Sequence, residues 1–250
     1  MAAHGIEGVV QIQGVFMDTA SGLVGSPGEK KWLEAYPVIV MEFLDGGSIY
    51  DVIHEREKIS EADLKRIYAG FIAALASMHT HGYIHNDLKL ENIMLESQTD
   101  DSGVKIIDLG FMNYLANGAS KITHSGVKGT PGYIAPETLS RHEYSYKTDM
   151  WQAGCVLYSM LSGVGDCWDA ISESAKDLVY KLLVLSPARR LGTQEVLQHP
   201  WITGQAPDVH LGDEYVARVK HLALRQKMRK FFLQNDILEK NKIRTDHIQR

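Results

Sequence analysis

The stretch YIHNDLKLENIML, residues 83–95, threads single polar side chains through an otherwise apolar run. Its polar members include Asp87, Lys89 and Asn92, and a further acid, Asp108, ends the next apolar run, VKII. A buried charge or amide without a partner is strongly penalised, so this pattern indicates a site held on a scaffold. Carboxylate and amide oxygens suit Mg2+ and lysine suits a polyphosphate, so the stretch predicts a site for both. The alternative is that these are loop acids bonded to backbone amides.

Three short motifs stand in order along the chain: HNDLKLEN at 85–92, DLG at 108–110 and GTPGYIAPE at 129–137. Together they resemble the catalytic loop, the metal-binding motif and the end of the activation segment of protein kinases. The resemblance implies a protein-kinase-like fold of the α+β class, with a mostly helical large lobe and a truncated small lobe. Among kinases, the chain resembles the eukaryotic serine/threonine enzymes of the calcium/calmodulin-dependent group.

The resemblance assigns roles to the polar residues of these motifs. Asp87 corresponds to the catalytic base that also orients the substrate hydroxyl, and Lys89 to the residue that neutralises the transferred phosphoryl group. Asn92 and Asp108 correspond to the Mg2+ ligands. Thr130 resembles the residue that in serine/threonine kinases faces the catalytic acid and lysine; the alternative is a turn threonine before the following proline.

One departure from the family pattern lies inside the catalytic loop. Asn86 stands where many kinases carry an arginine, which usually grips a phosphorylated activation loop. We therefore expect that phosphorylation of Ser120, Thr123 or Ser125 is not a strict requirement for activity.

The composition is that of an ordinary globular protein of 250 residues, with 44% hydrophobic and 23% charged residues. The net charge of -5 gives no overall attraction to nucleic acid or to an anionic membrane. Two cysteines, Cys155 and Cys167, imply no disulfide framework. No signal region follows Met1 and no apolar run approaches the ~20 residues of a membrane span, so we expect a reducing, cytoplasmic compartment.

In the N-terminal part, the stretch 4–17 has a β-branched core that reads as a strand entered from a Gly-rich turn, and 36–43 reads as the next strand. Between them, 18–34 is rich in Gly, Ser and Lys and reads as a loop. The glycines and lysines of this loop do not have the spacing of a phosphate-binding motif, so it is expected to be a hairpin loop. By resemblance, the second strand leads into the hinge that binds adenine.

The resemblance also implies which residues contact the base of ATP. Met41 would be the gatekeeper, and the backbone of Glu42 and Leu44 would bond the adenine edge. Met94 and Ile107 would form the floor of the pocket and the wall before the metal-binding acid. The alternative for the first three is that Met41 and Leu44 are core residues and Glu42 is a charge at a strand end.

Two stretches carry apolar residues at helical spacing, 61–81 and 146–163. Ser60 reads as the N-cap of the first, with Asp63 at the capping-box position. A shorter amphipathic helix is expected near 48–54. The two long stretches are therefore expected to form buried helices of the large lobe.

Several residues around these helices have structural rather than chemical expectations. His79 and His81 are expected to cap the first long helix or to face solvent, because no third metal ligand has recognisable spacing. By resemblance, Asp149 holds the backbone of the catalytic loop. Glu137 is likewise expected to pair with Arg190, and breaking such a pair would leave a buried charge.

The last part of the chain, 214–240, is rich in Lys and Arg around apolar residues. If this part is helical, its bulky apolar anchors have the spacing of a segment that inserts into a groove such as that of calmodulin. It also resembles the regulatory tail of calcium/calmodulin-regulated kinases. The anchors are Leu224, Met228, Phe231 and Ile237. The alternative is a helix docked on its own lobe.

The resemblance begins only at the fourth strand of the family, since the glycine-rich loop, the strand lysine and the helix glutamate have no match. We expect a remnant of the small lobe and hinge at 1–44, a large lobe at 45–203 and a basic tail at 204–250. The first hypothesis is a serine/threonine kinase that transfers the γ-phosphoryl group of Mg-ATP to a protein substrate. The second is an inactive kinase-like fragment that acts as a protein-binding module.

Overall fold

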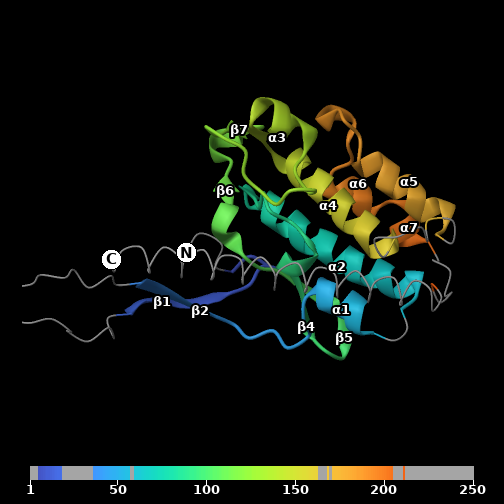
Figure 1. Ribbon diagram of the computed structural model, residues 1–250, viewed down its shortest axis with the longest axis horizontal. Coiled ribbons are helices and arrows are strands. Elements are labelled where there is room, and N and C mark those ends of the chain that lie inside the picture. The colour runs from blue at the N-terminus through green and yellow to red at the C-terminus, as the bar shows by residue number, and fades with distance from the viewer. Residues whose placement is uncertain are drawn as a thin grey trace, which may run out of the picture.

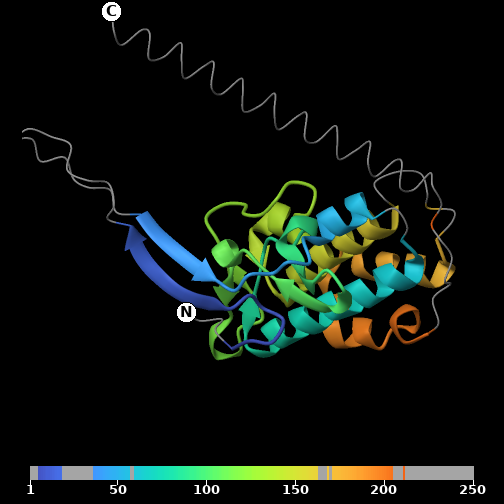
Figure 2. The ribbon, with the colours of Figure 1, turned by 90° about the horizontal axis from the view of Figure 1, so that it is seen from below.

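The computed structural model describes residues 5–18, 36–56, 59–162, 168, 171–204 and 211. A helical body is built around α2 (Glu61–Thr80) and α4 (Tyr146–Ser162), and a ribbon of β1 (Ile12–Asp18) and β2 (Tyr36–Met41) projects from it (Figure 1). Seen after a quarter turn, the ribbon again stands apart from the helices (Figure 2). The described part of the chain thus mixes helices and strands, as expected for the α+β class.

The other elements of the described residues are short. The helices are α1 (Ile49–Glu55), α3 (Pro136–Arg141), α5 (Glu173–Leu182), α6 (Thr193–Leu197) and α7 (Pro200–Thr203). The strands are β3 (Tyr83–Ile84), β4 (Ile93–Ser97), β5 (Asp100–Ile106), β6 (Asn113–Tyr114), β7 (Ile122–Thr123) and β8 (Glu143–Tyr144). They form antiparallel pairs, β1 with β2, β3 with β6, β4 with β5 and β7 with β8.

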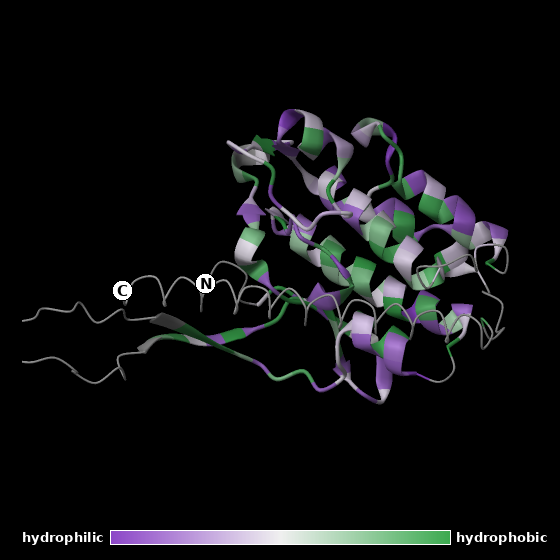
Figure 3. Cartoon of the chain, in the orientation of Figure 1, coloured by the Kyte–Doolittle hydropathy of each residue, from purple (hydrophilic) through white to green (hydrophobic). Residues whose placement is uncertain are grey.

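Helix α2 begins and ends close to where the sequence predicts. Ser60 accepts a hydrogen bond from the Asp63 amide, and the Asp63 carboxylate accepts one from the Ser60 amide, so the predicted capping box is confirmed. His81 is the C-cap. Hydrophobic and hydrophilic residues alternate along α2 and α4 (Figure 3), and the apolar ones are buried in a common core.

The two central helices form the scaffold on which the other elements pack. Met150, Val156 and Met160 of α4 are fully buried, and the Tyr68 hydroxyl of α2 donates to the Ala153 carbonyl at 3.1 Å. Burial of each large apolar side chain contributes about 1.5–3 kcal/mol, so this interface contributes substantially to the stability of the body. A rigid pair of helices is therefore available to hold the loops at their ends.

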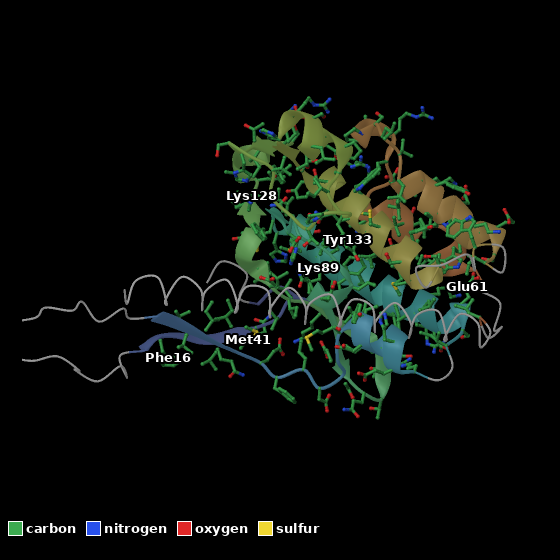
Figure 4. All side chains as sticks on the ribbon, in the orientation of Figure 1. Phe16, Met41, Glu61, Lys89, Lys128 and Tyr133 are labelled. Carbon is green, nitrogen blue, oxygen red and sulfur yellow. The ribbon has the colours of Figure 1, made fainter. Side chains whose placement is uncertain are left out.

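Glu61 is a buried acid at the far end of α2, away from the predicted site (Figure 4). Its carboxylate accepts hydrogen bonds from the Ser172 amide at 3.0 Å, from the Ser172 hydroxyl and from the Trp201 indole at 2.8 Å. An acid in the first turn also suits the positive end of the helix dipole. Glu61 therefore joins α2 to α5 and α7 and has a structural role.

The strand predicted within 4–17 is confirmed as β1, which begins at Ile12 and is preceded by a turn at Gly8. Gly8 has a φ of 75°, and a Cβ atom there would lie 2.3 Å from the Cβ of Ala74 in α2. The Val10 amide donates to the Ile106 carbonyl at 3.0 Å, and the Ile106 amide donates to the Gly8 carbonyl at 2.8 Å. The segment before β1 is thus turned against α2 and forms an isolated parallel bridge to β5, in which Val9 pairs with Ile106.

The ribbon exposes much apolar surface. Phe16 is 61% exposed and Ile39 is 53% exposed. Val15, which is also exposed, pairs with Ile39 in the strand register. The pairing of Asp18 with Tyr36 agrees with the expected hairpin, while the connecting residues 19–35 lie outside the described part. No helix in the described part of the chain is long and apolar enough to cross a membrane.

Candidate active site

The backbone of the catalytic loop is held by two side chains of α4. The carboxylate of Asp149 accepts hydrogen bonds from the His85 and Asn86 amides, each at 2.9 Å, which confirms the predicted role of Asp149. Gln152, one turn later, accepts from the Leu88 amide at 2.9 Å and donates to the Asn86 carbonyl at 2.8 Å. Gln152 was not predicted from the sequence, although a glutamine inside an apolar helix was an available signal.

His79 contacts the same acid, so the expectation that it caps the helix or faces solvent is wrong. Its Nε2 lies 2.9 Å from Asp149 Oδ2, and its side chain is only 9% exposed. The reason is tertiary: the last turn of α2 lies against the first turn of α4, which carries Asp149. His81, in contrast, is exposed at the C-cap as expected.

Asp87, Thr130 and Lys89 lie in mutual contact. The Thr130 amide and hydroxyl both donate to Asp87 Oδ1, at 2.8 and 2.6 Å. Lys89 Nζ lies 3.2 Å from Thr130 Oγ1 and 3.4 Å from Asp87 Oδ2. The structure therefore brings together the acid, the lysine and the threonine that the sequence motifs singled out from positions 41 residues apart.

Gly129 allows the activation segment to reach the catalytic loop. Its φ is 115°, and a Cβ atom at this position would lie 3.1 Å from the Asn86 carbonyl oxygen. A side chain would thus press on the loop just before Thr130, and a φ in this range is strained for any residue but glycine. The backbone conformation and the close approach therefore both favour glycine at the position directly before Thr130.

Asn92 and Asp108 flank the pairing of β4 with β5. Ile93 lies opposite Ile106, and the Ile107 amide donates to the Asn92 carbonyl at 2.9 Å. Asn92 Nδ2 donates to the Asp87 carbonyl at 2.8 Å, which ties this amide to the catalytic loop. Asp108 is exposed, has a φ of 58°, and accepts a hydrogen bond from the Gly110 amide at 3.4 Å.

The predicted adenine residues lie on the β4–β5 pair and at the end of the ribbon. Met94 lies between the buried Ile93 and Leu95 of β4, and Ile107 directly follows Ile106, the buried last residue of β5 that pairs with Ile93. Strand side chains alternate between faces, so both are placed on the face opposite to these buried residues. Leu44 is buried, whereas Met41 is 47% exposed at the end of β2. Figure 4 shows Met41 and Phe16 on the ribbon and Lys89 with Tyr133 in the helical body.

Glu42 has contacts that its strand-end position did not reveal. Its amide donates to the Gln11 carbonyl at 3.0 Å, and its carboxylate accepts from Lys105 Nζ at 2.6 Å and from the Gln11 amide at 2.7 Å. Burial acts to raise the pKa of Glu42, but the Lys105 and Gln11 hydrogen bonds and the Lys105 charge hold it below its ordinary value. The carboxylate therefore fixes the residue after Met41 to β5.

Tyr133 anchors the activation segment near the site. Burial, followed by the charge of Glu91, raises the pKa of its hydroxyl to about 12, although hydrogen bonds with Ser159 and the Leu90 backbone oppose the rise. The hydroxyl therefore stays neutral at physiological pH. Its partners lie in α4 and in the catalytic loop, so Tyr133 joins these two elements to the segment that carries Thr130.

The buried ion pair predicted between Glu137 and Arg190 is confirmed. Two guanidinium nitrogens donate to the two carboxylate oxygens, at 2.7 and 3.0 Å, and both side chains are at most 3% exposed. Arg190 also donates to the Val184 carbonyl and lies over the ring of Trp151. This pair fixes the end of the activation segment to the C-terminal part of the body.

Comparisons with known proteins agree with this geometry. A family profile described as the protein kinase domain matches residues 2–167. Calcium-dependent protein kinase 5 of Solanum tuberosum is 38% identical over 226 residues, which are 79% of this chain and 41% of the relative. Calcium-dependent protein kinase 13 of Oryza sativa subsp. japonica is 38% identical over 228 residues, or 80% of this chain and 40% of the relative.

The chain thus spans about two fifths of the length of the curated relatives it matches. The expected resemblance to calcium-regulated serine/threonine kinases and the expected protein-kinase-like α+β fold are confirmed by these matches. The chain belongs to the protein kinase family.

Proposed function

We propose that this chain is a serine/threonine protein kinase that transfers the γ-phosphoryl group of Mg-ATP to a hydroxyl of a protein substrate. The observation that carries the proposal is the contact of Asp87 with Thr130 and Lys89 on a loop fixed by α4. A binding module has no physical need for these contacts, so they favour an enzyme over the inactive alternative. Phosphoryl transfer to a peptide library by residues 1–250 tests the proposal.

The chemical step follows from the atoms of this contact. Thr130 donates to Oδ1 of Asp87 and leaves Oδ2 as the atom to orient the substrate hydroxyl and accept its proton. The hydroxyl oxygen attacks the γ-phosphorus, and ADP leaves. Lys89 Nζ, within 3.4 Å of the same carboxylate, would donate to an oxygen of the transferred group. Because Asp87 is 3% exposed, these charges act where little water screens them.

The donor set fits Mg2+, and we propose Asn92 and Asp108 as its ligands. Both supply oxygens, which hard cations prefer, and the phosphates of ATP would supply further ones. The Asn92 amide nitrogen is committed to the Asp87 carbonyl, so its side-chain oxygen is the atom that would ligate. When bound, the ion neutralises phosphate charge. The two residues themselves keep it beside the loop that carries Asp87.

The adenine site is proposed at the face of β4 and β5 that carries Met94 and Ile107. Leu44 and Met41 would cover the other side of the base. The Glu42 amide is committed to Gln11, so a bond from Glu42 to the adenine edge would come from its carbonyl oxygen. The backbone of Leu44 would complete the recognition of this edge.

We predict that the triple variant Ser120→Ala/Thr123→Ala/Ser125→Ala keeps its activity within about twofold of the wild type. The activation segment already has internal contacts, because β7 pairs with β8 and the Glu143 carboxylate accepts from Lys121 at 2.6 Å and contacts Arg141 at 3.1 Å. The Glu143 carboxylate thus already pairs with Lys121 and Arg141, the cations that a phosphate in this segment would otherwise bind. Initial rates of peptide phosphorylation check this. A loss of more than about tenfold would refute it.

The basic tail is proposed to bind calmodulin. Its anchors Leu224, Met228, Phe231 and Ile237 lie outside the described residues, so the proposal depends on their spacing and on the surrounding Lys and Arg. A peptide of residues 210–245 is expected to be retained on immobilised calmodulin in calcium and released by a chelator. A peptide with the four anchors changed to serine is the control. Failure of the native peptide to be retained in calcium would remove the proposal.

A cytoplasmic location is part of the same proposal. Burial raises the pKa of the Cys155 thiol to about 12, so this cysteine stays protonated and unreactive at physiological pH. It is free in the structure. A chain with so few cysteines suits a reducing compartment.

A further inference from the structure

Asn86 joins the catalytic loop to the segment after Asp108 by its side chain. Its Nδ2 donates to the Phe111 carbonyl oxygen at 2.8 Å, and Asn113 Nδ2 donates to the same oxygen at 2.8 Å. The carbonyl oxygen of Phe111 therefore accepts hydrogen bonds from two carboxamides, one that precedes it in the sequence and one that follows it. We call Asn86, Phe111 and Asn113 the amide clamp.

Both donors of the clamp are themselves fixed. The backbone of Asn86 is bonded to Asp149 and Gln152 of α4, and its φ of 70° is one that asparagine tolerates better than most residues. Asn113 lies in β6, opposite Ile84 of β3. The carbonyl of Phe111 is thus bonded to two side chains whose backbones are fixed by other contacts, with α4 and with β3.

The clamp acts on the turn that follows the metal-binding acid. Phe111 ends the 3₁₀ turn Leu109–Phe111, which begins directly after Asp108. The Met112 amide donates to the Leu109 carbonyl, and Asp108 accepts from the Gly110 amide. The Phe111 ring is 40% exposed, so its packing alone does not fix the turn. The hydrogen bonds to its carbonyl are what connect the turn to the catalytic loop.

The orientation of the Asn86 amide is set by this contact. Asn86 is 1% exposed, and among the described residues its Oδ1 is buried with no hydrogen-bond partner. A buried acceptor without a partner is unfavourable. The reversed orientation of the amide would be worse, because Oδ1 would then face the Phe111 carbonyl oxygen and the hydrogen bond from Nδ2 would be lost. A neutral, fully buried side chain is also unable to bind a phosphate from the activation segment. Its observed role is restricted to the clamp.

We propose that Asn86 is a positioning residue, and that the amide clamp holds Asp108 in place for Mg-ATP without any phosphorylated residue. This rests on the proposed kinase function. The clamp replaces a charged contact from a modified segment by two permanent hydrogen bonds within the chain. Asp108 is then ready to bind as soon as the protein folds.

Two substitutions test the clamp because both keep the backbone conformation of residue 86. Asn86→Gly removes the carboxamide, while Asn86→Asp keeps its shape and replaces the donor by an acceptor facing the Phe111 carbonyl. His142→Gly is the matched control, since His142 also has a positive φ, of 56°, and lies outside the clamp. If only the shape of the Asn86 side chain mattered, Asn86→Gly would show the defect and Asn86→Asp would not.

The first measurement is amide hydrogen exchange over residues 109–115 of the full chain without nucleotide. Both Asn86 variants are expected to exchange about tenfold faster there, and His142→Gly to match the wild type. The second is the Mg2+ concentration for half-maximal phosphoryl transfer, expected to rise about tenfold with the KM for peptide within about twofold. Unchanged exchange over 109–115 and an unchanged Mg2+ requirement in Asn86→Asp would overturn the proposal.

The hydrogen-exchange measurement and the Mg2+ measurement together distinguish a failure of the amide clamp from a failure of the proposed kinase function. If the wild-type chain transfers no phosphoryl group, the proposed function fails, and the exchange measurement still decides whether the clamp holds the turn. If the wild type is active and the variants show normal exchange and a normal Mg2+ requirement, the clamp alone fails.

Discussion

Asp87→Asn is expected to lower the rate of phosphoryl transfer about 1,000-fold while leaving the fold intact. The amide oxygen of asparagine can still accept the hydrogen bonds that Thr130 donates to Asp87 Oδ1, so the loop keeps its geometry. What is lost is a negatively charged acceptor for the substrate proton and the attraction for Lys89, 3.4 Å away. Steady-state rates with a peptide substrate measure the effect on kcat.

The matched control for this prediction is Asp177→Asn. Asp177 is also an aspartate that contacts a lysine, Lys181 at 2.7 Å, but its side chain is 49% exposed on α5. This variant is expected to keep the wild-type rate. A rate for Asp87→Asn equal to that of the control would show that Asp87 is not the catalytic acceptor.

Arg190→Ala is expected to destabilise the protein by about 3–5 kcal/mol. Glu137 is 4% exposed, and removal of the guanidinium leaves its carboxylate buried without the cation that donates two hydrogen bonds to it. Contacts of Arg190 with Val184 and Trp151 are lost as well. The shift of the urea unfolding midpoint measures the loss.

Lys181→Ala is the control for the ion pair, because Lys181 and Asp177 form an exposed pair on one helix face. Exposed pairs contribute less than about 1 kcal/mol, so the midpoint is expected to move little. An unfolding midpoint of Arg190→Ala as high as that of this control would mean that the buried pair does not hold the activation segment to the body.

Local sequence patterns predicted the parts of the fold that depend on neighbours along the chain. The capping box of Ser60 with Asp63 and the apolar periods of α2 and α4 are such patterns, and each was found within one or two residues. Strand β1 was likewise found within the predicted stretch 4–17, but the packing of the turn before it depends on the contact of Gly8 with Ala74, which lies far along the chain.

The same distinction applies to the site. Asp87, Lys89 and Thr130 were predicted because their motifs are distinctive, and the structure brings them together. Gln152 and the amide clamp were not predicted. Gln152 lies 66 residues from the carbonyl to which it donates, and Asn86 lies 25 residues from Phe111. No local pattern records which distant backbone group a buried amide will meet.

The proposed kinase activity is tested most directly by the transfer of phosphoryl groups from Mg-ATP to serine- and threonine-containing peptides by purified residues 1–250, with and without calcium-calmodulin. Circular dichroism must first show that the wild type and Asp87→Asn are equally folded. We expect that the wild type transfers phosphoryl groups and that Asp87→Asn does not. Two folded proteins that are equally inert would contradict it, and the function of the chain would then have to be sought in binding.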